Sequence, residues 1–209
     1  MAARQPHIVL IGDSIFDNGA YTRGEPDVVT HLARLIPEGW KATSCAVDGA
    51  TTAGVGAQLR RVPPQATHLA VSIGGNDALQ HVGLLSARVT TMVKALEMFA
   101  PHVDRFQREY GAAIASVRQQ GLPVIVCTIY DGRLEPQVAT AARMALSLFN
   151  DVILRAAATS GLPVLELRDI CNTASDYANP IEPSGPGGMK IAAAIAGLVD
   201  RLSTRAPAP

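Results

Sequence analysis

Five short apolar segments, separated by stretches with helical periodicity, limit this chain to one broad fold class. The first segment, HIVLIG at residues 7–12, is rich in β-branched residues and ends at a glycine, as buried strands often do. The other expected strands are 41–47, 68–75, 122–130 and 162–167. Because these segments are largely apolar along their whole length, the sequence predicts an α/β fold with a parallel sheet covered by helices on both faces.

The stretches between and after these strands have the apolar spacing of helices. The expected helices are 27–36, 52–62, 86–120, 137–160 and 187–202. Pro101 is expected to break the third of them into two, because proline lacks the N–H that an interior helical position needs. Since there is no internal repeat and no Gly- or Ser-rich linker, the sequence predicts one domain over residues 1–204 and a disordered tail at 205–209.

The charge balance and the apolar segments narrow the possible partners. The chain carries 18 Lys plus Arg and 18 Asp plus Glu, so its formal net charge is zero, which argues against nucleic acid or an anionic membrane as a partner. No segment approaches the roughly 20 apolar residues of a membrane span. The apolar run near the N-terminus is too short for a secretion signal, so we expect a cytoplasmic protein.

The sequence also offers no sign of a cofactor. The three cysteines are far apart and form no CxxC pair, so they are expected to be buried thiols. No group of His, Cys and Asp has metal-ligand spacing, and no glycine-rich phosphate-binding motif is present. We therefore expect a protein that works without a metal or nucleotide cofactor.

Polar residues follow the first three predicted strands, at the edge where the carboxyl ends of parallel strands meet. Ser14 follows a Gly-Asp turn after the first strand, where its hydroxyl would be exposed as a nucleophile. A tetrahedral oxyanion needs two or three fixed N–H donors. The backbone N–H groups of Ser14 and Gly49 and the side-chain amide of Asn76 are suited to supply them. Each signal is weak alone, but together they predict an acyl-transfer site.

The ordered set of GDS at residues 12–14, a glycine after the second strand, and GGND at residues 74–77 resembles the SGNH hydrolases, also called GDSL-type esterases and lipases. This resemblance implies a flavodoxin-like three-layer α/β/α sandwich with a sheet of about five strands. It also implies that Ser14 is the nucleophile and a backbone donor, and that Gly49 and Asn76 complete the oxyanion hole. The substrate would be a small-molecule ester of a small or medium acyl group, hydrolysed through an acyl-enzyme, and no cofactor would be required.

The last block of the family pattern, Asp-x-x-His followed by Pro-Ser, is altered in this chain. The corresponding stretch is Asn-Pro-Ile-Glu, and its register is fixed by Pro183, Ser184 and the helix after Gly188. Asn179 therefore occupies the place of the Asp and Glu182 occupies the place of the His. The base expected for a serine esterase of this family is thus missing, and activity is expected to be weaker than with histidine.

Three interpretations of this exchange remain open. In the first, Glu182 is the general base, and Asn179 donates an amide N–H to its carboxylate where an Asp would repel it. In the second, another histidine substitutes, and His81 is the candidate because it closely follows the GGND block. In the third, the site binds a carbonyl- or phosphate-bearing ligand without turnover. The acyl length, the alcohol and the oligomeric state remain open as well.

Several other polar residues are expected to have structural roles. Asp13 is expected to hold the turn around Ser14 through backbone hydrogen bonds. Asp17 and Asn18 are expected either to cap the first helical turn or to line the pocket, with capping favoured. Asp77 is expected to cap the helix that follows it. The remaining histidines are placed at the opposite end of the sheet (His7 and His68) or on helix surfaces (His31 and His102).

Overall fold

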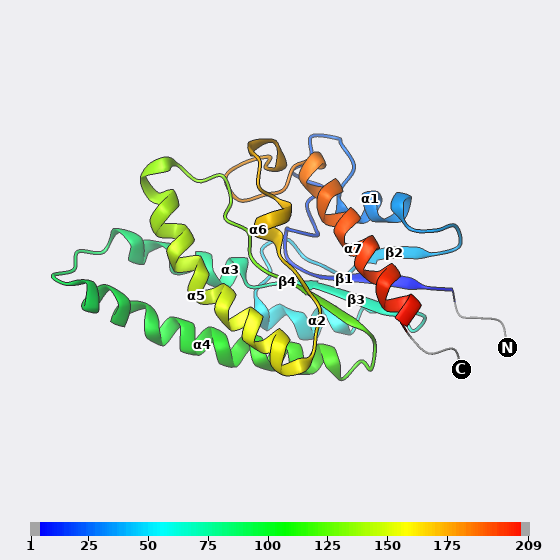
Figure 1. The fold of residues 1–209 in the computed structure, drawn as a ribbon, viewed down its shortest axis with the longest axis horizontal. Coiled ribbons are helices and arrows are strands. Elements are labelled where there is room, and N and C mark those ends of the chain that lie inside the picture. The colour runs from blue at the N-terminus through cyan, green and yellow to red at the C-terminus, as the bar shows by residue number, and fades with distance from the viewer. Residues whose placement is uncertain (1–4, 206–209) are drawn as a thin grey trace.

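The protein is a three-layer α/β/α sandwich in the computed structural model, which describes residues 5–205 (Figure 1). The five strands are all parallel and lie in the order β2-β1-β3-β4-β5. Their bounds are His7–Gly12 (β1), Lys41–Ser44 (β2), His68–Ser72 (β3), Val124–Cys127 (β4) and Val164–Leu165 (β5). The predicted fold class and the number of strands are confirmed.

Seven α-helices and three short 3-10 helices connect these strands within the described residues. The α-helices are Val28–Leu35 (α1), Val55–Leu59 (α2), Gly75–Leu79 (α3), Met92–Arg118 (α4), Pro136–Ser160 (α5), Leu167–Ile170 (α6) and Gly185–Arg205 (α7). The 3-10 helices are Thr52–Gly54 (η1), Val82–Ser86 (η2) and Ala174–Asp176 (η3). Within residues 5–205, no helix is both long enough and apolar enough to cross a membrane.

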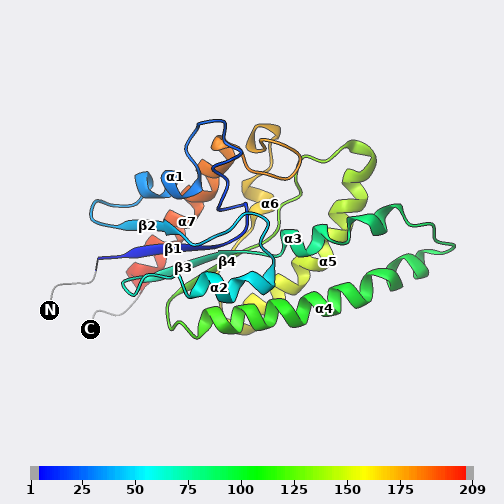
Figure 2. The ribbon, with the colours of Figure 1, turned by 180° about the vertical axis from the view of Figure 1, so that it is seen from behind.

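The alternation of side chains along each strand divides the core between the two faces of the sheet. Val9 and Ile11 of β1 face a cluster formed with α2, α4 and α5, whereas Ile8 and Leu10 face a cluster formed with α1 and α7. Figures 1 and 2 show the two groups of helices on opposite sides of the sheet, and all four side chains are fully buried. This two-sided burial explains why β1 has no polar face in the sequence.

The prediction that Pro101 divides the long helical region was wrong, because α4 continues through it. The side chain of Pro101 is exposed, so water can reach the backbone carbonyl that loses its usual N–H donor there. Beyond the proline, the buried side chains of Phe106, Tyr110, Ile114 and Val117 hold the helix against the sheet. Tertiary packing therefore outweighs the local cost of the proline.

The other differences concern where elements begin and end. Strands β2, β3, β4 and β5 are shorter than expected, and the segment after β5 forms the short helix α6. The last helix begins at Gly185, two residues before the predicted start. The expected disordered tail at 205–209 lies outside the described residues except for Arg205, which ends α7. The three cysteines are free and buried, as predicted.

A close contact between β1 and β3 fixes the start of the turn that carries Ser14. Gly12 has φ = 149°, and a Cβ there would lie 1.9 Å from the carbonyl oxygen of Ser72. The buried side chain of Gln58 accepts a hydrogen bond from the Gly12 N–H (2.8 Å) and donates one to its carbonyl (2.7 Å). The chain therefore leaves β1 with its backbone groups paired and in one defined direction.

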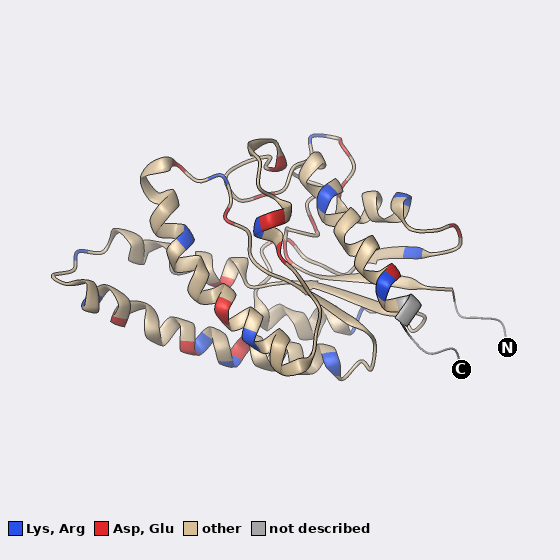
Figure 3. Ribbon diagram, in the orientation of Figure 1, with Lys and Arg blue, Asp and Glu red and all other residues tan. Residues whose placement is uncertain are grey.

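Both signs of charge are interspersed over the helical surface. Figure 3 shows basic and acidic positions side by side along α4, where Lys94 pairs with Glu97 (2.6 Å) and Arg105 with Glu109 (2.7 Å). These pairs are exposed, so each contributes little to stability. The described surface of α4 is therefore mixed in charge.

Candidate active site

The turn after β1 places Ser14 at the carboxyl edge of the sheet. The carbonyl of Asp13 accepts hydrogen bonds from the N–H groups of Phe16 (3.1 Å) and Asp17 (3.0 Å), and the Asp13 carboxyl accepts one from Ile15 (3.1 Å). Ser14 is 7% exposed and lines a pocket of about 130 Å³. Within the described residues, the N–H of Ser14 donates no hydrogen bond, so it is available to a ligand in the pocket.

Gly49 lies in the loop that follows β2 and requires a positive φ of 74°. Its neighbour Asp48 is held twice: its N–H donates to the Asp17 carboxylate (2.9 Å), and its own carboxylate accepts from the Tyr21 hydroxyl (2.6 Å). Among the described residues, the Gly49 N–H has no hydrogen-bond acceptor. Gly49 itself is not among the residues that line the pocket.

Asn76 lies in α3 and lines the pocket together with Ser14. Gly74 before it has φ = 122°, and a Cβ there would come within 2.8 Å of the Phe106 ring. One hydrogen of the Asn76 amide is donated to the carbonyl of Ala50 (3.0 Å), next to Gly49. The second amide hydrogen has no acceptor among the described residues. The bond to Ala50 holds the loops after β2 and β3 together, so the donors of Gly49 and Asn76 keep a fixed relative position.

Asp77 does not cap a helix as the sequence analysis predicted. It lies inside α3, and its buried carboxylate accepts hydrogen bonds from the Thr52 hydroxyl (2.6 Å) and the Thr52 N–H (3.1 Å). Asp77 therefore links the start of η1 to α3 and strengthens the connection between the loops that carry Gly49 and Asn76.

Glu182 lies in the loop before α7 and lines the same pocket as Ser14. The side chain is 6% exposed, and this burial raises the pKa of the Glu182 carboxyl. The nearby Ser14 hydroxyl opposes the rise in pKa by favouring the ionised form. The second carboxyl oxygen, Oε2, is buried without a hydrogen-bond partner among the described residues. A carboxyl group thus faces the candidate nucleophile.

The backbone around Glu182 is held from several elements. The Tyr130 hydroxyl donates to the carbonyl of Ile181 (2.6 Å), and the Asn18 amide donates to the carbonyl of Pro183 (3.2 Å). Glu182 itself accepts a hydrogen bond from the N–H of Ala178 (2.9 Å). Since both neighbours of Glu182 are anchored, the position of its side chain is fixed relative to Ser14.

Asn179 is arranged differently from the expectation. Its side-chain carbonyl, Oδ1, accepts hydrogen bonds from the backbone N–H groups of Ile181 and Glu182, each at 2.9 Å. Among the described residues, its amide N–H makes no hydrogen bond to the Glu182 carboxylate. Asn179 thus shapes the backbone of the loop, and any influence on Glu182 acts through that backbone.

The histidines occupy several distinct environments. His7 and His68 lie at the start of β1 and β3, away from the carboxyl edge, as expected. His31 was expected at the surface but is buried in α1, where it contributes to the packing of α1. His81 lines the pocket and stacks on His102 with the ring centroids 4.0 Å apart, and burial, together with the nearby His102, lowers the pKa of His81.

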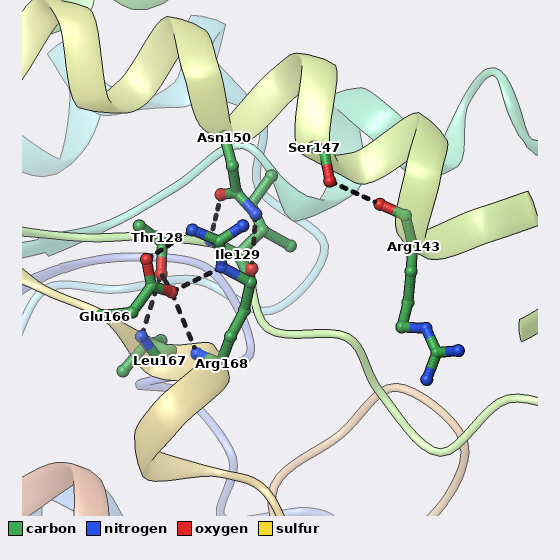
Figure 4. A network of polar contacts seen from close by, with 8 residues as sticks. All are labelled: Thr128, Ile129, Arg143, Ser147, Asn150, Glu166, Leu167 and Arg168. Carbon is green, nitrogen blue, oxygen red and sulfur yellow. Dashed lines mark hydrogen bonds and ion pairs between the residues drawn. The ribbon is translucent and has the colours of Figure 1, made fainter. Parts of the chain in front are cut away.

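A polar network behind the pocket holds the segment after β4 (Figure 4). Asn150 of α5 accepts from the Ile129 N–H and donates to its carbonyl, both at 2.8 Å. Glu166 accepts from the Thr128 hydroxyl (2.6 Å) and pairs with the Arg168 guanidinium (2.7 and 2.5 Å). Burial alone would raise the pKa of Glu166, but these hydrogen bonds lower it overall. The network thereby fixes the wall formed by Thr128 and Ile129.

Sequence reasoning did not find the residues that position the site. Asn18 was expected to cap a helical turn or to line the pocket. It is absent from the pocket lining, but it accepts from the Val28 N–H (3.0 Å) and also holds the Glu182 loop. Gln58 and Asn150 were not singled out at all. Their partners are remote in sequence, so no local pattern would have identified them. Within residues 5–205, no group of three His, Cys, Asp or Glu side chains is arranged to bind a metal ion.

The buried carboxyl of Asp13 makes the stability of the folded protein depend on pH. It is 2% exposed, and burial raises its pKa to about 7, with the charges of Glu182 and Asp77 adding to the rise. Between pH 3.8, the ordinary pKa of an aspartate, and about pH 7, the folded state therefore keeps a proton that the unfolded state has released. The stability from this group is present in full below pH 3.8 and is lost as the pH rises toward 7.

Replacing Asp13 with Asn is therefore expected to reduce the loss of stability between pH 5 and pH 8. Asn keeps an oxygen for the Ile15 N–H but cannot ionise, and each unit of pKa shift corresponds to about 1.4 kcal/mol. Urea unfolding of both proteins at the two pH values measures the difference. An equal decline in the wild-type and Asp13→Asn proteins would contradict this assignment.

Comparison with known proteins places the chain in a family. Residues 10–188 match the GDSL-like lipase/acylhydrolase family, and the chain belongs to that family. Comparison with the curated proteins finds no match. The resemblance inferred from Ser14, Gly49 and the GGND block is thereby confirmed at the level of the family.

Solved structures of similar fold extend over nearly the whole chain. An extracellular lipase from Streptomyces rimosus has a TM-score of 0.65 at 18% identity and covers 94% of this chain and 99% of its own. A phospholipase A1 from Streptomyces albidoflavus has a TM-score of 0.66 at 16% identity, covering 97% and 100%. A carbohydrate acetylesterase from Sinorhizobium meliloti has a TM-score of 0.67 at 13% identity, covering 95% and 100%. These similarities establish the shared fold.

Proposed function

We propose that the protein is a serine hydrolase of carboxylic esters in which Glu182 takes the role that histidine has in the family. Membership of a lipase and acylhydrolase family supports the reaction class. The observation that carries the choice of base is that the Glu182 carboxyl lines the same pocket as the Ser14 hydroxyl and is near enough to it for the hydroxyl to influence its pKa.

In the proposed reaction, the Ser14 hydroxyl attacks the ester carbonyl while Glu182 accepts its proton. The negative charge that develops on the carbonyl oxygen is stabilised by the N–H groups of Ser14 and Gly49 and by the free amide hydrogen of Asn76. Collapse of the tetrahedral intermediate breaks the bond to the alcohol, which leaves with the proton from Glu182. Water then attacks the acyl-enzyme and gives its proton to Glu182. Glu182 passes this proton to the Ser14 oxygen as the bond between Ser14 and the acyl group breaks and the carboxylic acid departs.

The basicity of Glu182 determines how fast the proposed reaction can proceed. The ordinary pKa of glutamate lies about 2 units below that of histidine, which corresponds to about 3 kcal/mol of proton affinity. Burial raises the pKa of Glu182 and recovers part of this difference. The Oε2 atom has no protein partner among the described residues, so the proton does not have to displace an existing hydrogen bond.

A fluorophosphonate probe tests whether the site is an enzyme or a non-catalytic binding site. Such a probe reacts covalently only with an activated serine hydroxyl, so we expect labelling of Ser14, detected by mass spectrometry of the labelled peptide. The Ser116→Ala protein, altered at a serine of α4 that does not line the pocket, is the matched control and should be labelled equally. Absence of labelling in a folded protein would favour the binding role instead.

A further inference from the structure

The pocket that begins at Ser14 changes character as it extends away from the sheet. Most of its polar lining residues are concentrated near the strand ends, where Ser14, Asn76 and Glu182 lie. His81, directly before η2, also lines the pocket, with its ring stacked 6.4 Å from that of Phe149. The lining side chains from η2, α4 and α5 are all apolar: Val82, Leu85, Phe99, Ala142, Ala145, Leu146 and Phe149. Figures 1 and 2 show these three elements beside one another, with the ends of α4 and α5 nearest η2 extending beyond the sheet.

This apolar wall distinguishes a hydrocarbon group of an ester from a polyhydroxylated one. A sugar or another polyhydroxylated alcohol placed there would lose its hydrogen bonds to water without replacement. An alkyl chain would instead exchange water for apolar contacts, which is favourable for each methylene that is buried. The wall therefore fits the hydrocarbon chain of an acyl group, whose carbonyl carbon lies at Ser14.

The spacing of the lining residues on α5 sets the length of that chain. Ala142, Ala145, Leu146 and Phe149 follow one another at helical spacing and present one continuous stripe to the pocket. This stripe is about 10 Å long at 1.5 Å per residue. A fully extended chain advances about 1.2 Å per bond, so the stripe matches about eight carbons.

We propose that this pocket is an acyl-chain subsite and that the substrate is an ester of a linear aliphatic acid of medium length, about six to ten carbons. The inference rests on the proposed esterase function and specifies its substrate class. The small side chains of Ala142 and Ala145 leave the space that the chain occupies, and Leu79 and Val82, 39% and 58% exposed, line the pocket where it meets solvent.

The test uses p-nitrophenyl acetate, butyrate, octanoate and decanoate, each below its micellar concentration. Wild-type kcat/KM is expected to rise roughly threefold per methylene up to octanoate. Ala145→Phe, which fills the subsite, is expected to lower octanoate hydrolysis by at least tenfold and acetate hydrolysis by less than threefold. Met144→Phe adds the same ring on the neighbouring position, which is 68% exposed, and should leave the chain-length profile unchanged.

A second variant guards against misfolding of the first. Val82→Trp enlarges a side chain at the exposed mouth and is expected to reduce octanoate hydrolysis selectively, without disturbing buried packing. The melting temperature of each variant is measured alongside its kinetics. A wild-type preference for acetate, or equal losses for acetate and octanoate in the folded variants, would overturn the acyl-chain assignment.

Ligand binding separates failure of this inference from failure of the esterase function. In the Ser14→Ala protein, which cannot form an acyl-enzyme, 1-decanol should still raise the melting temperature, because it binds the folded state. This rise should disappear when Ala145→Phe is added to Ser14→Ala and persist when Met144→Phe is added. Decanol binding with that pattern, but no ester hydrolysis by wild type, would support the subsite and refute the esterase. Ester hydrolysis without decanol binding would do the reverse.

Discussion

Replacing Ser14 with alanine is expected to lower kcat/KM for p-nitrophenyl esters at least about a thousandfold. The hydroxyl is the attacking atom in the proposed reaction. The other two hydroxyl side chains between β1 and α1 are engaged elsewhere, because Tyr21 donates to the Asp48 carboxylate and Thr22 donates to backbone carbonyls. The oxyanion donors remain in the variant, so any residual activity should resemble that of a site that binds the ester and admits water. Initial rates with purified wild-type and Ser14→Ala proteins measure the loss.

The control for this experiment is Ser116→Ala, which removes an exposed hydroxyl that donates only to a carbonyl within α4. It should retain the wild-type rate. Thermal unfolding of both variants establishes that they are folded. Full esterase activity in the Ser14→Ala protein would end the assignment of Ser14 as nucleophile.

Replacing Glu182 with glutamine is expected to reduce kcat about a hundredfold to ten-thousandfold, the usual range for loss of a positioned base. Glutamine matches the shape of the side chain but cannot accept the proton from Ser14. KM should change much less than kcat, because Glu182 contributes to proton transfer and not to holding the acyl chain. Steady-state kinetics with p-nitrophenyl butyrate separate the two constants. Activity indifferent to Glu182 would reject its role as base.

The pH dependence of kcat/KM provides a second measure of Glu182. The base must be ionised to act, and burial raises its pKa above the ordinary value of 4.5, so activity should fall as the pH decreases through a midpoint above 4.5. Asp13 also titrates near pH 7 in the same pocket, so the profile of Asp13→Asn identifies the limb that belongs to Glu182. His81→Ala should retain this limb. If His81→Ala loses it while Glu182→Gln keeps it, His81 is the base.

The combined change of Asn179→Asp and Glu182→His restores the pattern of the family. If Glu182 is the base in the wild type, the double variant should be active, with an acid limb near the histidine value of ~6.5. A double variant without activity, although folded and retaining the labelling of Ser14, would indicate that this loop does not present a base to Ser14.

The fold could be predicted because strands that are buried on both faces of a sheet appear in the sequence as continuous apolar segments. The segment 7–12 was predicted with its observed bounds, since every residue of it is buried. The loops after β1 and β3, which line one pocket, were expected to meet because the carboxyl ends of parallel strands share an edge. The continuity of α4 through Pro101 was missed because it depends on packing against other elements, which a local rule does not include.

The side chains that hold the loops of the site through hydrogen bonds could not be predicted from the sequence. Gln58 and Asn150 each bind both backbone groups of one residue on another element, and neither has a neighbouring sequence pattern that distinguishes it from a surface amide. For Asn179, the sequence analysis expected the side-chain N–H to donate to Glu182, whereas the side-chain oxygen accepts backbone hydrogen bonds instead. Its position before Pro180 is typical of a turn in which the side-chain oxygen accepts backbone hydrogen bonds, as the structure has it.

The way Asn179 binds its own loop has a consequence for how this active site can change over evolutionary time. An aspartate at the same position offers an oxygen to the same two N–H groups, so the loop keeps its backbone whichever of the two residues is present. The remaining anchors, from Tyr130 and Asn18, also act on the main chain. If Glu182 is the base, as we propose, we therefore expect position 182 to accept another proton acceptor on the same backbone. A library randomised at 179 and 182 would then sample alternative bases without redesigning the fold.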